Sequence, residues 1–503
     1  MGYVAEQSQT RFVLLEDQSL TTTYRDNSFV GYLTALPVNG LDRPLLNHLY
    51  PWPKPAKNQE LDKPSLSLCT IEAILRQHGI EPAQIVFAHP RFVLNGKFSF
   101  RPTDIILLST MDPLGLGPAT SSWQYLYRGV PFHSQTFWEL FLKLRSLKNK
   151  VGFKVILGGP GSWQLKHLQS TNALGADVLF IGEAEQELPG IIDEIQQGSG
   201  IKAEHQTIQA RHVQESAFLP VSRPSNLHMI EISRGCGRMC EFCVPTTSGK
   251  MRFVPDSVIY GSTRSLIDHG VRTVCLQSED TLRYGSKNFE IDEEGIISLY
   301  QNIFKQGMKR IFITHATLVH FADQPDTIQR LSALLHDHGH RYYSVQPGIE
   351  SGSERIMRQL MGGKFLPRSD MSWHDIVLDA FSVMQQNRWV PIASVIVGLP
   401  QEEHEDIMAT EQLIDELISR SYRFLFAPLL FVPVPTTPLE ASQRPRLLTL
   451  NPEQKRVFKK MWKYNTRTIV DVWNVPNLNG YEFPHWKARL LKMTLTLAST
   501  FLH

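Results

Sequence analysis

The sequence predicts an α/β protein: a doubly wound sheet, then a partial (β/α)6 barrel, then a small and mostly helical C-terminal segment. Three observations predict this class. Short apolar runs alternate with amphipathic stretches of helical period over 11–205, and the same alternation resumes over 228–430. From residue 431 the composition changes to a proline-rich stretch, which is followed by a basic helical pattern. We therefore expect domains at 1–210, 211–430 and 431–503.

The first part is expected to contain five strands with helices between them. Each strand is a short apolar run bounded by polar or turn residues, at 11–17, 83–89, 103–109, 153–158 and 176–181. Helices are predicted at 65–79 and 136–149, where apolar residues recur on one helical face. Ligands of doubly wound sheets bind at the carboxyl ends of the strands, near the point where the strand order reverses.

Glycine-bearing loops follow three of these strands. They read "STMDPLGLG" at 109–117, "LGGPG" at 157–161 and "IGEAE" at 181–185. Because glycine has no side chain, it lets the backbone approach a large planar ligand closely. Many sheets of this class carry such loops, so the loops indicate a ligand site without naming the ligand.

The second part contains the most specific motif. Three of the five cysteines of the chain lie in "RGCGRMCEFC" at 234–243, with the spacing C-x3-C-x2-C. Disulfides within so short a loop would be strained, and a tetrahedral zinc site needs four ligands where this stretch offers three. Cys236, Cys240 and Cys243 can instead hold a [4Fe–4S] cluster by three irons and leave the fourth iron open. Cys69 and Cys275 stand alone in apolar stretches, so we predict that both are buried.

Six strands are expected to form the barrel around this loop. They are the apolar runs at 228–235, 271–280, 308–318, 340–350, 390–400 and 422–430. Functional groups of βα barrels lie at the C-terminal ends of the strands. The candidates there are Ser278, Glu279 and Asp280 after the second strand, Gln346, Glu350 and Ser351 after the fourth, and Val397 and Gly398 after the fifth.

The cysteine spacing, with the aromatic Phe242 before the last cysteine, resembles the signature of radical S-adenosylmethionine (SAM) enzymes. The resemblance implies that the open iron binds the amino and carboxylate groups of SAM, and that reduction then yields a 5′-deoxyadenosyl radical. It also implies that the polar groups at the strand ends bind the amine, carboxylate and ribose of SAM. The implied SAM contacts are Phe242, Ser278, Glu279, Asp280, Gln346, Glu350, Ser351, Val397 and Gly398.

Two further stretches narrow the resemblance. "GIESGSERIM" at 348–357 and "IVGLPQE" at 396–402 are similar to stretches of class B radical SAM enzymes, in which a cobalamin-binding domain precedes the barrel. The resemblance implies that the glycine-bearing loops bind cobalamin. The implied contacts are Ser109, Thr110, Met111, Asp112, Leu114, Gly115, Gly158, Gly159, Pro160, Gly161, Gly182, Glu183 and Glu185.

The sequence departs from many cobalamin-binding domains in one respect. The motif D-x-H-x-x-G, whose histidine ligates cobalt from below, is absent, and Ser19 stands near the place of the histidine. We therefore expect cobalamin without a lower histidine ligand, as is common in class B enzymes. The competing interpretation is a degenerate domain that binds no cobalamin.

The resemblance implies a cobalamin-dependent radical SAM C-methyltransferase that moves a methyl group from SAM, through methylcobalamin, to an unactivated sp3 carbon. Within the class, the run "MCEFCVPTTSGKMRFVP" at 239–255 resembles the archaeal glutamine C-methyltransferase of methyl-coenzyme M reductase. Its substrate would be a protein or peptide.

Three other readings remain at this point. One is a class B enzyme acting on a small molecule, such as an oxidative cyclase or a natural-product or lipid methyltransferase. Another is a tRNA methylthiotransferase, which would need three more cluster cysteines in the first domain, where Cys69 stands alone. The last is a non-enzymatic cobalamin or iron–sulfur sensor.

The remaining features concern partners and location. A proline-rich insertion at 39–64 is expected to be a lid, a binding loop or a wrapped surface loop. The basic residues after 451, interleaved with aromatics, are expected to cap the substrate side of the barrel rather than to bind nucleic acid. A net charge of +2 and the lack of a long apolar run or secretory signal lead us to expect a cytoplasmic protein. The resemblance to class B radical SAM enzymes implies an electron donor as partner, and we expect a monomer.

Overall fold

The computed structural model describes two compact units. The described residues are 10–22, 34–35, 38, 47–48, 50–127, 129–170, 173–197, 206–243, 249–434, 437–443 and 449–473, together with 486, 489 and 493. The first unit comprises Met1–Met229 with Arg264–His269, and the second comprises Ile230–Thr263 with Gly270–His503. The sequence-based boundaries at 210 and 430 stay predictions.

The first unit is built on a sheet of six parallel strands in the order β2-β1-β3-β4-β5-β6. The strands are β1 (Phe12–Glu16), β2 (Ile85–Phe87), β3 (Ile105–Ser109), β4 (Lys154–Gly158), β5 (Val178–Ile181) and β6 (Gln206–Gln209). The five predicted strands are all present, but the predicted number was wrong because β6 was missed. Its sequence QTIQ is polar at both ends and lies at the sheet edge, so it carries no apolar run.

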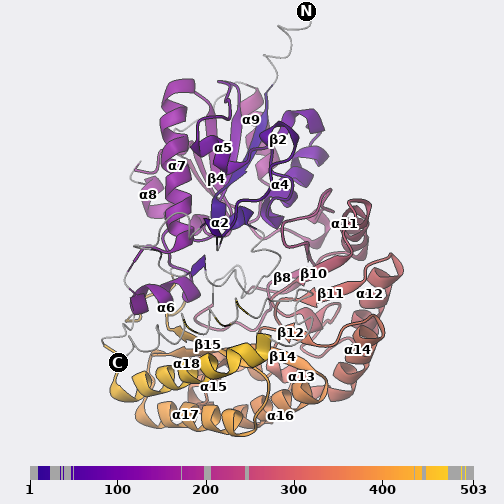
Figure 1. The fold of residues 1–503 in the computed structure, drawn as a ribbon, viewed down its shortest axis with the longest axis vertical. Helices are drawn as coiled ribbons and strands as arrows, with labels where there is room; N and C mark the ends of the chain where they lie inside the picture. The colour runs from indigo at the N-terminus through magenta and orange to yellow at the C-terminus, as the bar shows by residue number, and fades with distance from the viewer. Residues whose placement is uncertain are drawn as a thin grey trace, which may run out of the picture. The chain divides into compact units, whose positions relative to one another are not determined.

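Helices cover both faces of this sheet (Figure 1). Val13, Leu15 and Ile106 pack against α7 on one face, while Phe12, Leu14 and Ile105 pack against α4 and α9 on the other. Because successive strand residues point to opposite faces, both alternating sets are apolar. The helices of the unit are α2 (Gln18–Thr21), α4 (Leu66–Gln77), α5 (Pro90–Leu94), α6 (Pro118–Tyr127), α7 (Phe132–Val151), α8 (Lys166–Ser170) and α9 (Leu188–Gln196).

Four short 3₁₀ segments, η3 (Lys57–Gln59), η4 (Pro82–Gln84), η5 (Ser162–Leu165) and η6 (Glu215–Ala217), complete the described part of the unit. Part of the predicted insertion at 39–64 lies outside the described residues. The described stretch packs onto the unit: Tyr50 is 2% exposed and stacks on Phe132 at 4.2 Å. Its carbonyl accepts a hydrogen bond of 2.8 Å from Gln18. This packing favours the wrapped loop over a lid.

The second unit contains the six predicted barrel strands. They are β7 (Met229–Glu231) with β8 (Ser233–Arg234), β10 (Thr273–Gln277), β11 (Arg310–Ile313), β12 (Tyr343–Val345) with β13 (Gly348–Glu350), β14 (Trp389–Val397) and β15 (Leu425–Leu430). Strand β10 pairs with β7 and β11, and these three strands form one set. In the second set, β14 pairs with β12, β13 and β15. A bridge between His315 and Gln346 joins the two sets. The first and fourth strands are each split in two, and β8 pairs in antiparallel with β9 (Arg252–Phe253).

Helices surround these strands, as Figure 1 shows for the orange and yellow part of the chain. They are α11 (Asp256–Asp268), α12 (Glu293–Lys305), α13 (Leu318–Asp323), α14 (Pro325–Asp337), α15 (Glu354–Met361), α16 (Trp373–Gln386), α17 (His404–Ser419) and α18 (Pro452–Trp473), with η7 (Thr281–Arg283) and η8 (Gly362–Phe365). Helix α18, predicted from the basic pattern, packs on β15 and α17. No helix among the described residues is long and apolar enough to span a membrane.

Candidate functional site

The cysteine motif forms a loop directly after β8. Gly235 and Gly237 adopt positive φ values of 77° and 72°. A Cβ on Gly235 would lie 2.6 Å from the carbonyl oxygen of Gly249, so a larger residue cannot stand there. The Cys243 N–H donates to the Cys240 carbonyl over 3.0 Å, which closes the end of the loop. The glycines therefore let the loop fold back on itself.

None of the three cysteines forms a disulfide. Burial raises the pKa of the Cys236 thiol and raises that of Cys240 to about 12. A metal would therefore have to displace protons from these thiols on binding. Within the described ranges no three His, Cys, Asp or Glu side chains converge on one ion. Ligands of a single zinc lie about 3.8 Å apart, whereas thiolates of a cubane cluster bind different irons and stand farther apart.

The second-strand candidates differ in what their side chains do. The Ser278 hydroxyl lies 2.6 Å from that of Ser233 and accepts the Asp280 N–H over 3.0 Å. Burial raises the pKa of Glu279 to about 7, and its Oε2 has no hydrogen-bond partner among the described residues. Glu279 is thus a carboxyl group at the strand end that accepts from the backbone N–H groups of Glu279 and Gly235 and keeps one oxygen unbonded among the described residues.

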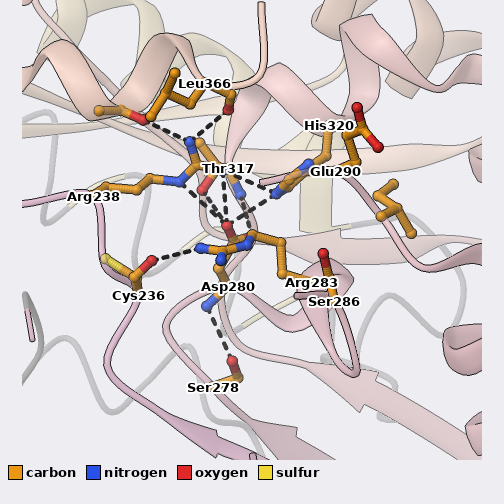
Figure 2. Close-up of polar contacts among 12 residues, drawn as sticks. Cys236, Arg238, Ser278, Asp280, Arg283, Ser286, Glu290, Thr317, His320 and Leu366 are labelled. Atoms are coloured by element: carbon orange, nitrogen blue, oxygen red, sulfur yellow. Dashed lines mark hydrogen bonds and ion pairs between the residues drawn. The ribbon is translucent and has the colours of Figure 1, made fainter. Parts of the chain in front are cut away.

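Asp280 lies in a fully buried polar network, which Figure 2 shows. Its Oδ2 lies 3.1 Å from Arg238 Nη2 and 3.0 Å from His320 Nε2, and it accepts from the Thr317 hydroxyl over 2.9 Å. Burial opposes its ionisation, but His320 and Arg238 hold the pKa of Asp280 well below its usual range. Asp280 Oδ1 accepts the Thr317 N–H over 3.1 Å, so both carboxylate oxygens are engaged with protein groups, and a SAM contact by Asp280 stays a prediction.

The candidates at the end of the fourth strand include Glu350, whose backbone is in the left-handed conformation. Glu350 has a φ of 62°, and its carboxylate accepts from Lys364 Nζ over 2.6 Å and from the Ser394 hydroxyl over 3.0 Å. Ser351 lies 3.2 Å from the Thr410 hydroxyl and accepts from the Ser353 N–H. The Gln346 N–H donates to the Thr314 carbonyl over 3.1 Å.

The fifth strand ends at Val397, and Gly398 follows with a φ of 82°. Phe242, in the cysteine loop, is half-buried. The fold thus brings the cysteine loop and the ends of β10, β12–β13 and β14 into one unit. Their roles in binding SAM stay predictions.

In the first unit, the loop after β3 is fixed by Asp112. Its Oδ1 accepts from the Gly117 N–H over 3.2 Å and from Gln164 over 2.7 Å. Gln164 also accepts the Leu114 N–H, Gly115 has a φ of 69°, and Met111 is 43% exposed. The loop is therefore rigidly held while its methionine projects outward.

Buried polar atoms gather where β1 and β3 end. Glu16 lies opposite Ser109 across the β1–β3 pair. Glu16 Oε2, Ser109 Oγ and Thr110 Oγ1 are all buried, and none has a hydrogen-bond partner in the part of the chain that the structure describes. This edge is the point where the strand order reverses, at which sheets of this class bind ligands. Unsatisfied buried polar groups are costly, so their grouping here fits a polar ligand.

The glycines of the loops at 157–161 and 181–185 lie very close to the backbone of neighbouring segments. A Cβ on Gly159 would lie 2.6 Å from the Thr110 nitrogen, and one on Gly161 would lie 2.2 Å from the Met111 carbonyl oxygen. A Cβ on Gly182 would lie 2.8 Å from the Ala210 carbonyl oxygen. Close packing between neighbouring loops therefore already requires these glycines. Their approach to a ligand, together with that of Gly158, Pro160, Glu183 and Glu185, stays a prediction.

Several residues of these sites were not predicted from the sequence. A histidine of α7, His133, lies with its Nδ1 2.7 Å from the Ser19 hydroxyl, which in turn donates to Asp17 over 2.6 Å. Arg238 stands inside the cysteine motif and could have been singled out by its place between two cysteines. Its partner His320 lies 82 residues away in sequence, so no local pattern points to it.

No protein-family model matches the chain. The tRNA-2-methylthio-N(6)-dimethylallyladenosine synthase of Aeromonas salmonicida is 27% identical over 311 residues, 59% of each chain. The ribosomal protein uS12 methylthiotransferase RimO of Aquifex aeolicus is 25% identical over 48% of this chain and 55% of that protein. The chain therefore spans less than two thirds of the length of these curated relatives.

Among solved structures, the chain is similar to the radical S-adenosylmethionine methyltransferase TsrM from Kitasatospora setae, solved with cobalamin and a [4Fe–4S] cluster bound. The TM-score is 0.53 at 14% identity, over 86% of this chain and 74% of that chain. The chain shares the fold of TsrM. A second TsrM structure, with tryptophan substrate and a SAM analogue, gives a TM-score of 0.54 at 14% identity over 83% and 72%. The likeness confirms the predicted fold class.

Proposed function

We propose that the protein is a cobalamin-dependent radical SAM C-methyltransferase. The observation that carries the proposal is the C-x3-C-x2-C loop, held by positive-φ glycines after the first strand of a partial barrel, in a chain whose fold also contains a doubly wound sheet. The TsrM likeness supports the pairing of these two parts, since it covers 86% of the chain.

Cys236, Cys240 and Cys243 would hold a [4Fe–4S] cluster. Three thiols on one short loop, none in a disulfide, fit a cluster bound by three irons. When bound, the reduced cluster would supply one electron to SAM, whose C–S bond then breaks to give methionine and the organic radical, and cobalamin would supply the methyl group. The chain's own task is to hold these reactants and to exclude water.

The carboxyl ends of the barrel strands would hold SAM. Glu279 offers an unsatisfied carboxyl oxygen beside the loop, a suitable partner for an ammonium group. The positive φ of Gly398 turns the chain directly after β14, and Phe242 offers an aromatic face for an adenine. Ser278, Ser351 and Glu350 would act by fixing the shapes of their own turns.

The edge of β1 and β3 would hold part of cobalamin. The unpartnered atoms of Glu16, Ser109 and Thr110 fit a ligand with many amide groups, which can both donate and accept. Met111, exposed at the tip of the same loop, offers an apolar contact to the face of a planar ring.

For the methyl acceptor we propose a carbon of a protein residue, in line with the resemblance to the enzyme that modifies a glutamine of methyl-coenzyme M reductase. A small-molecule acceptor is the second candidate, and the tryptophan bound in one TsrM structure favours it. An external electron donor is required in either case.

Methylthio transfer is the function named for the curated sequence relatives. The chain has five cysteines, and outside the motif only Cys69 and Cys275 remain. Cys69 is fully buried on α4, and Cys275 lies on β10 and is partly buried. The chain therefore lacks the three further cluster cysteines that this function is expected to need.

Anaerobic reconstitution tests the proposal. The protein is supplied with iron, sulfide, cobalamin, a reductant and methyl-labelled SAM, and is offered a glutamine-containing peptide or free tryptophan. The proposal predicts S-adenosylhomocysteine, 5′-deoxyadenosine and an acceptor heavier by one methylene. A product that gains sulfur would overturn it in favour of methylthio transfer, and labelled methyl on a carbon of tryptophan alone would favour the small-molecule acceptor.

A further inference from the structure

Arg238 lies between two of the proposed cluster cysteines in the sequence, and polar partners surround its guanidinium group. The side chain is 3% exposed. Nη1 donates to the carbonyls of Gly363 and Leu366, each over 2.8 Å, while Nε and Nη2 lie 3.3 and 3.1 Å from Asp280 Oδ2. Nη2 also lies 3.0 Å from His320 Nε2. Four of the five N–H donors of the guanidinium thus have a carbonyl or carboxylate partner, and the fifth faces His320 Nε2, which either accepts from Arg238 or donates to Asp280 according to its tautomer.

The network ties the cysteine loop to three other segments, as Figure 2 shows. Asp280 follows β10, His320 and Thr317 belong to the start of α13, and the two carbonyls belong to η8 and the residue after it. The Glu241 N–H adds a bond of 2.9 Å to the Leu360 carbonyl. A Cβ on Gly363 would lie 2.1 Å from the Arg238 carbonyl oxygen, so the loop and η8 are in close contact. The loop is therefore fixed by the protein on several sides.

A second arginine reaches the loop directly. Arg283 Nη1 donates to the Cys236 carbonyl over 2.6 Å, and its other nitrogens donate to the Asn288 carbonyl over 3.1 and 2.9 Å. The Arg283 guanidinium lies 4.4 Å from the ring centre of Phe289, and that of Arg238 lies 5.3 Å from the same ring. The two cations thus share one aromatic ring; Asp280 forms an ion pair with Arg238, and the nearby charge of Arg283 also lowers the pKa of the Asp280 carboxyl.

Two buried cations lie close to the cysteine loop. Arg238 and Arg283 carry two positive charges, Asp280 carries one negative charge, and the Glu279 carboxyl, whose pKa burial raises to about 7, also acts on the Cys236 thiol. On the other sides, Lys364 is paired with Glu350 over 2.6 Å and Arg234 with Glu231 over 2.8 Å, so these pairs are neutral. The Arg238 backbone N–H also hydrogen-bonds the Cys236 thiol. Two buried cations therefore lie beside three cysteines that become thiolates when they bind iron.

We infer that Arg238, held by Asp280, and Arg283, held by the Asn288 carbonyl, position the cysteine loop and supply the charge that makes the bound cluster easier to reduce. This inference rests on the proposed function. The charge and the hydrogen bonds around an iron–sulfur cluster help to set its reduction potential. A positive charge close to the cluster stabilises the state that has taken up one electron from an external reductant. These are positioning residues, because their side chains bind the loop rather than iron.

The test is a redox titration of the reconstituted cluster, followed by its reduced-state electron paramagnetic resonance signal. Arg283→Gln, which removes a positive charge, is expected to lower the midpoint potential. Asp280→Asn, which removes the negative charge at nearly constant shape, is expected to raise it. Arg283→Lys keeps the charge and is expected to stay close to the wild type. Potentials that move in the same direction, or not at all, would overturn the inference.

Iron content tests the positioning role. Arg238→Lys keeps the charge but cannot supply five donors in a plane. It is expected to lose bound iron to a chelator at least several-fold faster than the wild type, while Arg11→Lys is expected to match the wild type. Arg11 is the matched control because it forms a comparable pair with buried Asp104, at 2.7 Å, in the first unit. Equal loss rates in Arg238→Lys and the wild type would contradict the positioning role.

The result also separates this inference from the proposed function. If the wild-type protein takes up no iron and sulfide, the proposed function fails. If the wild type holds a cluster and the Arg283 and Asp280 variants share its potential, only the inference fails. A variant that does not fold is recognised by its thermal unfolding, and Arg283→Lys against Arg283→Gln then decides the outcome.

Discussion

Asn465 on α18 makes both hydrogen bonds of its side-chain amide with the backbone of a single residue, Phe426 on β15. Asn465 Oδ1 accepts the Phe426 N–H over 3.0 Å, and Asn465 Nδ2 donates to the Phe426 carbonyl over 2.8 Å. The Asn465 side chain therefore hydrogen-bonds the backbone of β15 as a neighbouring strand would. Because Asn465 is 4% exposed, water cannot take over these bonds.

Replacing Asn465 should therefore be costly. Asn465→Ala leaves a buried N–H and a buried C=O of Phe426 without partners, and we expect it to lower the free energy of unfolding by about 2–3 kcal/mol. Thr468→Ala on the same helix is the control, because its hydroxyl bonds only the Tyr464 carbonyl of the helix itself. Urea unfolding followed by circular dichroism measures both. Equal stability of the two variants would contradict a role for Asn465 in covering β15.

Close packing between the loops after β3 and β4 makes a second prediction. Gly159 and Gly152 have nearly the same φ, 95° and 94°, but a Cβ on Gly152 would meet nothing within 4 Å, whereas one on Gly159 would meet Ser109 and Thr110. We expect Gly152→Ala to cost about 1 kcal/mol from backbone strain alone. Gly159→Ala should cost about 1–3 kcal/mol more, because the neighbouring loop must move. Thermal unfolding of the two variants checks this difference, and equal costs would show that the loops are not in firm contact.

The buried Glu16 makes stability depend on pH. Burial, with a smaller contribution from Asp17, raises its pKa to about 7 from an ordinary 4.5. The folded state therefore keeps a proton that the unfolded state releases, so stability falls as the pH rises from 4.5 to 7 and is level above that range. Glu16→Gln carries no such proton. It should match the wild type near pH 4.5 and exceed it by about 3 kcal/mol at pH 8.

Urea unfolding at the two pH values measures this effect. Thr468→Ala, which removes no ionisable group, is the control and should show the same difference from the wild type at both pH values. A Glu16→Gln variant whose stability relative to the wild type does not change with pH would mean that Glu16 is ionised in the folded protein.

Much of the fold could be predicted from short apolar runs. Phe12–Glu16 and Ile105–Ser109 are buried along their whole length, so the pattern that predicts a strand is strong there. Gln206–Gln209 is an edge strand with polar ends, and its pairing with β5 depends on backbone bonds that leave no mark on composition. Likewise, no pattern in α18 indicates that Asn465 is the residue that bonds β15.

The candidate site could be predicted only where its residues are close in sequence. The spacing of the three cysteines predicts that they act together, and the periodicity of the apolar runs predicts the barrel strands. The contacts around the loop could not be predicted in this way, because Arg238 contacts Asp280, His320 and Leu366 across 42, 82 and 128 residues. The glycines of the β4 loop were interpreted as ligand contacts, but their packing against Thr110 and Met111 is a tertiary requirement that the sequence does not reveal.

The central claim is that the cysteine loop carries an iron–sulfur cluster, and Cys240 tests it most directly because it is the most buried of the three cysteines. After anaerobic reconstitution, iron and acid-labile sulfide are measured per chain in the wild type, in Cys240→Ala and in Cys69→Ala. We predict about four iron atoms in the wild type and in Cys69→Ala, and a loss of most of the iron in Cys240→Ala. Equal iron and sulfide in Cys240→Ala and the wild type would contradict the account.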